Sequence, residues 1–356
     1  MRFVPIDSVK EGMILAKPLL GKKGELLLQK GAVIFPSYIK RIKQLGYNGI
    51  FIDDNLSREV IFPEVVDENL KIEAVRALKS AFAKIGQCSC SSPEVYNDLY
   101  NTVNDIVDSI LESKDALVSI IDLKSFDDYT FYHCVNVCIL SIVIGKALGF
   151  NKSRLYNLGL SAVLHDIGKT FIPKQILNKN GRLTDEEFDI IKTHSSWGYR
   201  YVRTNIRIPS SAYIGILHHH ERFDGTGYPM GIKSDKISLF GRVISVADVY
   251  DALISERPYR KALPHFEAFE YVMGNGKTAF DPEIVKVFSK RVAPYPVGTS
   301  VILSNNKTGL VVENHADCAT RPKVKIYKHG DADVKPYYID LKNDKDTMDV
   351  VIIGVV

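Results

Sequence analysis

Apolar residues recur at helical spacing through most of the middle of the chain and in short alternating runs near both ends. Val137, Leu140, Ile144 and Leu148 follow one another at steps of three or four, which places them on one face of a helix. Similar patterns continue from about 94 to 291. The sequence therefore predicts a mainly α protein, with a small α/β module at the N-terminus and a small β-rich unit at the C-terminus.

Glycine, serine and proline clusters indicate where these units meet. A breaker-rich loop, Gly86–Pro93, interrupts the helical pattern, and Pro294, Pro296 and Gly298 end it. We expect an N-terminal module with a candidate regulatory role at 1–62 and a helical linker at 63–97. A helical domain should follow at 98–295, and a β-rich unit at 296–356. The pattern leaves open whether the linker helix packs within the chain or pairs with a second copy in a homodimer.

Composition narrows the class of protein. The 356 residues include 46 basic and 42 acidic side chains, for a net charge of +4, and 46% are hydrophobic. These values are ordinary for a globular protein and exclude disordered, collagen-like and coiled-coil classes. So small a charge gives no reason to expect a nucleic-acid polymer as partner. The longest apolar run, Val137–Gly145, is nine residues, well below the roughly 18 that span a bilayer. We expect a cytoplasmic protein that does not bind a membrane.

Histidines concentrate in the predicted helical domain, where six of the nine lie between 133 and 220. His133 leads an apolar helix face, where a lone histidine is more often a hydrogen-bonded core residue than a metal ligand. His165 and Asp166 follow a second apolar run, and Gly168 is expected to end that helix. Adjacent imidazole and carboxylate groups at a helix end can reach one cation together.

Three further blocks add groups of the same kind. His194 follows a capping box, Thr184–Glu187, and is predicted to face inward with Ile190 and Ile191. Three consecutive histidines, 218–220, precede a turn-forming run, and Asp248 lies in an apolar helical pattern. A buried carboxylate costs several kcal/mol unless it is paired or metal-bound. Imidazole with carboxylate suits Fe, Mn or Zn better than Ca or Mg, and a bridging carboxylate would hold two ions roughly 3.5–4 Å apart.

The order and context of these blocks resemble the HD-GYP family, a bacterial signalling subgroup of the HD metal-dependent phosphohydrolases. His165-Asp166 and Gly227-Tyr228-Pro229 are the residues that give the family its name, and the match covers roughly 98–295. The resemblance implies an HD-type helical bundle that hydrolyses cyclic di-GMP to linear pGpG and on to GMP. It also implies a centre of two or three ions, commonly iron or manganese.

Position by position, the resemblance assigns roles to residues of this chain. Asp166 would bridge two ions, Lys169 would lie beside the scissile phosphate, and His218 has no counterpart among the ligands. The metal ligands would be His133, His165, Asp166, His194, His219, His220 and Asp248. Arg257 and Arg260 match phosphate-binding cations. The turn after the histidines has two possible roles: a structural loop that Tyr228 anchors, or a set of contacts to the substrate. Its residues are Asp224, Gly225, Gly227, Tyr228 and Pro229.

One departure from the family pattern affects the expected number of metal ions. Members with three ions have a glutamate one helical turn before the first histidine, and Tyr129 occupies that position here. Since phenol is a poor ligand unless ionised, we expect two ions and attack on the phosphodiester by a metal-bridging hydroxide. Two alternatives stay open: an HD-type phosphohydrolase acting on another nucleotide or cyclic dinucleotide, and a non-catalytic cyclic di-GMP receptor.

Overall fold

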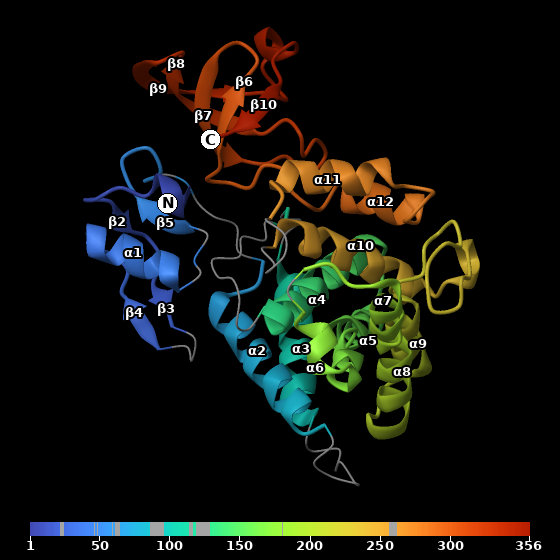
Figure 1. Cartoon of the computed structure of the whole chain (residues 1–356). Helices are drawn as coiled ribbons and strands as arrows, with labels where there is room; N and C mark the ends of the chain where they lie inside the picture. Colours follow the sequence, from blue (N-terminus) through green and yellow to red (C-terminus); the bar gives the residue numbers. More distant parts are fainter. Residues whose placement is uncertain are drawn as a thin grey trace.

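A helical body forms most of the molecule, and two smaller units lie beside it (Figure 1). The computed structural model describes residues 1–356 except 22–24, 46, 48, 59, 61–64, 86–95, 114–116, 119–128, 180 and 256–261. The helices of the body are α2 (Glu68–Ala83), α3 (Asn97–Glu112), α4 (Tyr129–Ala147), α5 (Lys152–Val163), α6 (Lys174–Leu177), α7 (Asp185–Lys192), α8 (His194–Asn205), α9 (Ser210–His218), α10 (Leu239–Ile254), α11 (His265–Gly274) and α12 (Pro282–Phe288). A short 3-10 helix, η3 (Ile167–Phe171), connects α5 to α6.

Helix α4 runs through the centre of this body and packs against α5 and α10. Its stretch Thr130–Ala147 is long and apolar enough to cross a bilayer, but 72% of it is buried inside the fold. Its apolar composition is therefore that of a core helix, whose whole circumference is covered by neighbouring helices.

The N-terminal unit is a small α/β module, as predicted. Strand β5 (Gly49–Asp53) pairs antiparallel with β1 (Arg2–Pro5) and β2 (Ile14–Leu15). A second pair of strands, β3 (Leu19–Leu20) and β4 (Leu26–Leu28), and helix α1 (Pro36–Gln44) complete the unit. Its own apolar cluster lies between the helix and the larger sheet and includes Ile42 and Ile50.

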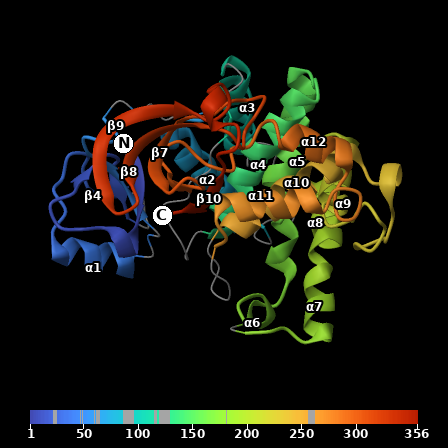
Figure 2. The same cartoon turned by 90° about the horizontal axis from the view of Figure 1, so that it is seen from above.

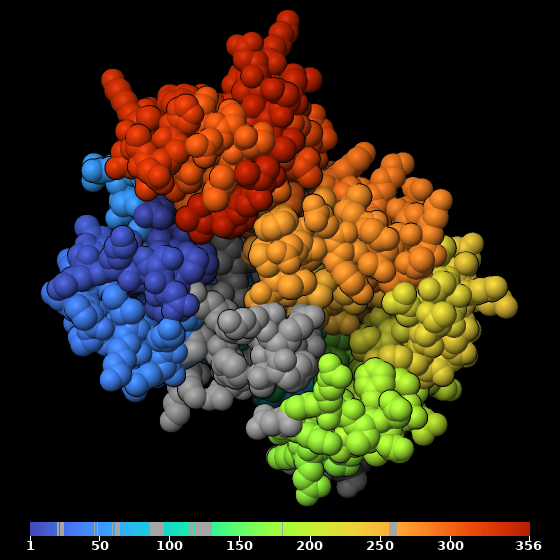
Figure 3. Space-filling view, turned by 45° about the horizontal axis from the view of Figure 1, so that its top comes forward, coloured from blue at the N-terminus to red at the C-terminus, as the bar shows by residue number. Residues whose placement is uncertain are grey.

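The C-terminal unit is an antiparallel sheet of five strands, in the order β10-β6-β7-β8-β9. The strands are β6 (Ser300–Leu303), β7 (Lys307–Glu313), β8 (Lys323–His329), β9 (Ala332–Asp340) and β10 (Ile352–Val355). It lies against the N-terminal unit, because Val60, Val297 and Leu310 form one buried cluster. Figures 2 and 3 show this unit, in red, beside the blue N-terminal unit and the orange helices.

The linker helix belongs to the helical body. Ala74, Val75 and Leu78 of α2 are buried in the same apolar core as α3, α4 and α5. Of the two alternatives left open by the sequence, this packing favours a helix that packs within its own chain; a homodimer stays a prediction. The exact boundaries between the expected segments stay a prediction.

Candidate metal centre

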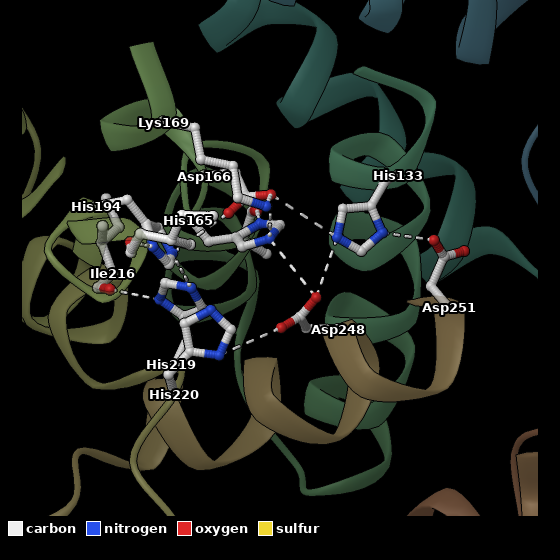
Figure 4. Close-up of polar contacts among 12 residues, drawn as sticks. His133, His165, Asp166, Lys169, His194, Ile216, His219, His220, Asp248 and Asp251 are labelled. Carbon is white, nitrogen blue, oxygen red and sulfur yellow. Dashed lines mark hydrogen bonds and ion pairs between the residues drawn. The ribbon is translucent and has the colours of Figure 1, made fainter. Parts of the chain in front are cut away.

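The structure brings all seven predicted metal ligands together at the centre of the helical body (Figure 4). His133 comes from α4, His194 begins α8, and Asp248 lies on α10. The remaining ligands lie at helix ends: His165 and Asp166 in the turn after α5, and His219 and His220 directly after α9. All of them are buried except His220, which is partly exposed.

The local structure differs from the expectation at Gly168. Helix α5 ends at Val163, before the His-Asp pair, and Gly168 lies inside η3. A Cβ at position 168 would lie 1.8 Å from the backbone oxygen of His194. Glycine is therefore required here because η3 and α8 approach so closely, which brings Asp166 next to His194.

The structure around His194 also differs in part from the one predicted from the sequence. The predicted capping box at Thr184 and Glu187 is present and begins α7. That helix ends at Lys192, and Ile190 is 39% exposed rather than inward-facing. His194 faces inward because it is the first residue of the next helix, which has its own direction.

One group of ligand atoms surrounds the first candidate ion position. Nε2 of His133 lies 3.0 Å from Oδ1 of Asp248 and 4.0 Å from Oδ2 of Asp166. Nε2 of His165 lies 3.4 Å from the same Asp166 oxygen and 3.9 Å from Oδ1 of Asp248. Two imidazole nitrogens and two carboxylates thus point at one place.

A second group lies on the other side of Asp166. Nε2 of His194 is 3.5 Å from Oδ1 of Asp166 and 3.3 Å from Nε2 of His219. Ligand atoms of His194, His219 and His220 all lie within 4.8 Å of one another. Asp166 therefore directs one oxygen to each group, which is the arrangement that a bridging carboxylate requires.

Backbone carbonyl groups fix which ring nitrogen of three histidines faces the centre. The Nδ1 atoms of His165, His194 and His219 lie 2.6–2.7 Å from the carbonyl oxygens of the residues three positions earlier, Ala162, Ile191 and Ile216. Because a carbonyl oxygen only accepts, each Nδ1 carries the proton and each Nε2 keeps a lone pair. These three rings are therefore held in the form that binds a metal ion.

The sequence reasoning missed one carboxylate. Nδ1 of His133 donates to Oδ2 of Asp251 at 2.6 Å, and Asp251 is completely buried. It lies three residues after Asp248 on α10, so both carboxylates occupy the same helix face. That spacing was the available signal, and a second carboxylate beside a metal-binding histidine is a common supporting contact.

The electrostatics favour ionised carboxylates and mostly neutral imidazoles. Burial opposes ionisation of Asp166, but the charge of Lys169 and contacts from His165 and His194 hold its pKa well below the usual range. Burial lowers the pKa of His194 to about 4 and that of His220 to about 3. Neutral imidazoles and charged carboxylates are the forms that coordinate metal ions.

The donor set fits divalent metal ions. Nε2 of His165 and Oδ1 of Asp166 are buried without a hydrogen-bond partner, although buried polar atoms are normally paired. Both atoms point into the ligand groups described above. An imidazole-rich set with bridging carboxylate matches first-row ions such as iron, manganese or zinc.

Other predicted site residues surround the ligands or fall outside the described part of the chain. Nζ of Lys169 lies 2.6 Å from Oδ2 of Asp166, with 28% of its side chain exposed. His218 accepts a hydrogen bond from the backbone N–H of Ser238 at 3.0 Å, and it belongs to none of the ligand groups found among the described residues. Arg257, Arg260 and the side chain of Tyr129 lie outside the described residues.

The loop from Asp224 to Pro229 covers the second ligand group. The Tyr228 ring stacks on His220, with centroids 4.7 Å apart and planes 31° apart. The buried carboxylate of Glu221 accepts a hydrogen bond from the backbone N–H of Met230 at 2.7 Å. These contacts support the expectation that Tyr228 anchors the loop, and they place its ring against His220, a predicted metal ligand.

Comparison with known proteins agrees with an HD-type fold. Residues 113–284 match the HD domain family. The chain is 40% identical over 225 residues to the cyclic di-GMP phosphodiesterase PA4108 of Pseudomonas aeruginosa, covering 63% of this chain and 54% of that protein. It is 36% identical over 194 residues to a cyclic di-GMP phosphodiesterase of Thermotoga maritima, and the match covers 54% of this chain and 51% of that protein. The chain thus spans about half the length of these relatives.

Two further matches extend the comparison. A 3′3′-cGAMP-specific phosphodiesterase of Vibrio cholerae is 35% identical over 181 residues, covering 51% of this chain and 39% of that protein. The solved structure of an HDG"Y"P protein from Bdellovibrio bacteriovorus aligns over 80% of this chain and 97% of its own, with a TM-score of 0.49 and 17% identity.

The helical bundle and its buried histidine and aspartate groups define an HD-domain protein. More narrowly, the His165-Asp166 pair, the Gly227-Tyr228-Pro229 loop and relatives named cyclic di-GMP phosphodiesterases support assignment of this domain to the HD-GYP family.

Proposed function

We propose that this chain is a metal-dependent phosphodiesterase that hydrolyses cyclic di-GMP to linear pGpG and on to GMP. The relatives with that activity support the substrate. The observation that carries the proposal is the position of Asp166, whose two oxygens face two adjoining groups of predicted histidine ligands. Such a paired site is the arrangement used for hydrolysis of phosphodiesters.

The chain's own residues supply the rest of the chemistry. Two bound divalent ions would offset the charge of a phosphate and lower the pKa of a coordinated water. His133, His165, Asp166 and Asp248 would hold one ion, and Asp166, His194, His219 and His220 the other. Lys169 adds a positive charge beside Asp166, in a position to stabilise negative charge that develops on the phosphoryl oxygens. Arg257 and Arg260 are proposed to hold the second phosphate through their planar guanidinium groups.

The direct test is a turnover assay with defined metals. Metal-free protein is loaded with Mn(II), or anaerobically with Fe(II), and hydrolysis of cyclic di-GMP is followed beside Asp166→Ala. We expect the wild type to turn over and the variant to lose activity by about a hundredfold or more, together with its metal. A matched control is Asp235→Asn, which removes an exposed carboxylate far outside the ligand groups. Full activity of Asp166→Ala would overturn the proposal.

A second candidate substrate follows from the relatives. One of them is named a 3′3′-cGAMP-specific phosphodiesterase, so a mixed dinucleotide is a second candidate substrate for this chain. A panel of cyclic di-GMP, 3′3′-cGAMP and cyclic di-AMP separates these substrates. Tight binding of cyclic di-GMP without turnover, under either metal, would instead favour a receptor. The cytoplasmic location, absence of membrane binding and homodimer remain predictions.

A further inference from the structure

A cavity of about 380 Å³ opens directly beside the metal centre. Its wall includes His220 and two residues of α10 that flank Asp248, Ser245 and Val249. The volume lies in the range of roughly 300–1,000 Å³ that is typical of small-molecule sites. A group attached to a phosphate at the metal centre is therefore in reach of this cavity.

Aromatic side chains form much of the cavity wall. Phe188 comes from α7, Tyr228 from the loop after α9, and Tyr271 from α11, with Phe280 behind them. Phe188 and Tyr271 are 44% and 43% exposed. Nζ of Lys192 lies 4.7 Å from the centroid of the Phe188 ring, so the Tyr271 ring is the more accessible of the two to a ligand. Aromatic walls bind flat nucleobases by stacking.

The cations in the wall are already accompanied by carboxylates. Nζ of Lys192 donates to Oδ1 of Asp189 at 2.7 Å. Nη2 of Arg222 lies 3.6 Å from Oδ2 of Asp224. Each positive charge is offset by a neighbouring negative one, so this wall attracts a phosphate weakly. A neutral, planar base is the better match for its chemistry.

The turn after the histidines fixes the guanidinium group of Arg222. Its Nε donates to Oγ1 of Thr226 at 2.8 Å, and Thr226 donates its hydroxyl to Oδ1 of Asp224 at 2.6 Å. The 3.6 Å between Nη2 and Asp224 is longer than a hydrogen bond. The guanidinium is thus oriented by Nε at Thr226 and by the Asp224 carboxylate beside Nη2. Because a guanidinium carries five N–H donors, these two contacts leave donors on its terminal nitrogens for a ligand.

We propose that this cavity binds one purine base of the cyclic dinucleotide and that Arg222 selects guanine over adenine. The inference rests on the proposed function and specifies its substrate. Guanine presents two acceptors, O6 and N7, that match an arginine fork. Adenine presents N7 beside an amino group, so one guanidinium donor would face another donor. A glutamine at position 222 would favour adenine instead, because its amide pairs with N6 and N7 of adenine.

A kinetic comparison of two variants tests the selection. We expect wild-type kcat/KM for cyclic di-GMP to exceed that for cyclic di-AMP by about tenfold or more, and Arg222→Gln to remove or reverse that ratio. Lys192→Gln is the matched control, since it removes a positive charge from the same wall without removing the guanidinium fork. It is expected to change both substrates by the same factor. The proposal is overturned if Arg222→Gln also changes both substrates equally while its metal content matches wild type.

A binding measurement separates this inference from the proposed function. GMP and AMP are titrated calorimetrically into the full chain in EDTA, where no hydrolysis takes place. GMP is expected to bind about tenfold more tightly than AMP to the wild type, and this preference is expected to disappear in Arg222→Gln. Equal binding of GMP and AMP to wild type would refute the base site even if cyclic di-GMP is hydrolysed. Failure of the metal-loaded enzyme to hydrolyse any cyclic dinucleotide would refute the function but leave the calorimetric result standing.

Discussion

Oδ2 of Asp251 lies 2.6 Å from Nδ1 of His133, and the opposite nitrogen of that ring faces Asp248 at 3.0 Å. The buried ring is therefore held between two carboxylates of one helix. The contact with Asp251 keeps the proton on Nδ1, so that Nε2 is the nitrogen presented to the metal centre.

Removal of this contact should weaken metal binding without removing a ligand. We predict that Asp251→Asn lowers the affinity for Mn(II) by about 10- to 100-fold, because the amide holds the imidazole less firmly and does not supply its negative charge. Competition with a chelator of known affinity measures the change. Asp235→Asn, at an exposed carboxylate on the short helix before α10, is the control and should bind as wild type does. An unchanged affinity in Asp251→Asn would show that His133 needs no such support.

The same pair of carboxylates makes metal binding depend on pH. Burial favours the neutral ring, but hydrogen bonds and charge from Asp248 and Asp251 outweigh it and raise the pKa of His133 from 6.5 to about 9 in the metal-free protein. Below pH 9 the ring is protonated, and an ion must displace that proton. Mn(II) affinity should therefore rise by up to about tenfold per pH unit between pH 7 and 9 and level off above it.

Asp251→Asn supplies the control for this pH dependence. With one carboxylate removed, the pKa of His133 falls, so the plateau in Mn(II) affinity should begin at a lower pH than in wild type. Calorimetry in buffers of different ionisation enthalpy counts the protons released. Wild-type affinity that is flat from pH 7 to 9, with no proton released, would contradict a charged His133.

Gly168 should tolerate no side chain. A Cβ would lie 1.8 Å from the backbone oxygen of His194, so Gly168→Ala must separate η3 from α8. We expect a loss of about 1–3 kcal/mol in the free energy of unfolding, measured with urea, and weaker metal binding because Asp166 and His194 move apart. Gly274→Ala is the matched control, since nothing lies within 4 Å of its Cβ. Gly274→Ala should be neutral or more stable by up to about 1 kcal/mol; equal stability of both variants would contradict the close approach.

Tyr228 should act through its ring rather than its hydroxyl. The ring stacks on His220, and burial raises the pKa of the phenol, so it stays protonated at neutral pH. Tyr228→Phe keeps the stack and should retain activity, whereas Tyr228→Ala should lose both activity and metal affinity. Steady-state kinetics with metal analysis compares the two. A drop of about a hundredfold or more in Tyr228→Phe would instead indicate proton transfer by the hydroxyl.

The sequence was informative where a periodic pattern or a motif determines the local structure. Apolar spacing predicted α4 and a β-rich C-terminal unit, and the capping box predicted the start of α7. The expected ligands, from His133 to Asp248, do converge. Their roles as ligands stay predictions, as do those of Arg257 and Arg260.

What the sequence did not reveal depends on contacts between distant segments. The end of α5 at Val163 and the place of Gly168 follow from the packing of η3 against α8, which no local pattern encodes. The exposure of Ile190 follows from the break between α7 and α8 at Thr193. Asp251 was visible three residues after Asp248, but its partner lies 118 positions earlier in the chain.

The metal content of active protein tests whether Asp166 would hold two ions at once. Elemental analysis of anaerobically loaded, desalted protein should give two ions per chain at full activity for the wild type. Asp166→Ala should hold one ion or none and be inactive. Three ions per chain at full activity, or two ions retained by Asp166→Ala, would contradict the account.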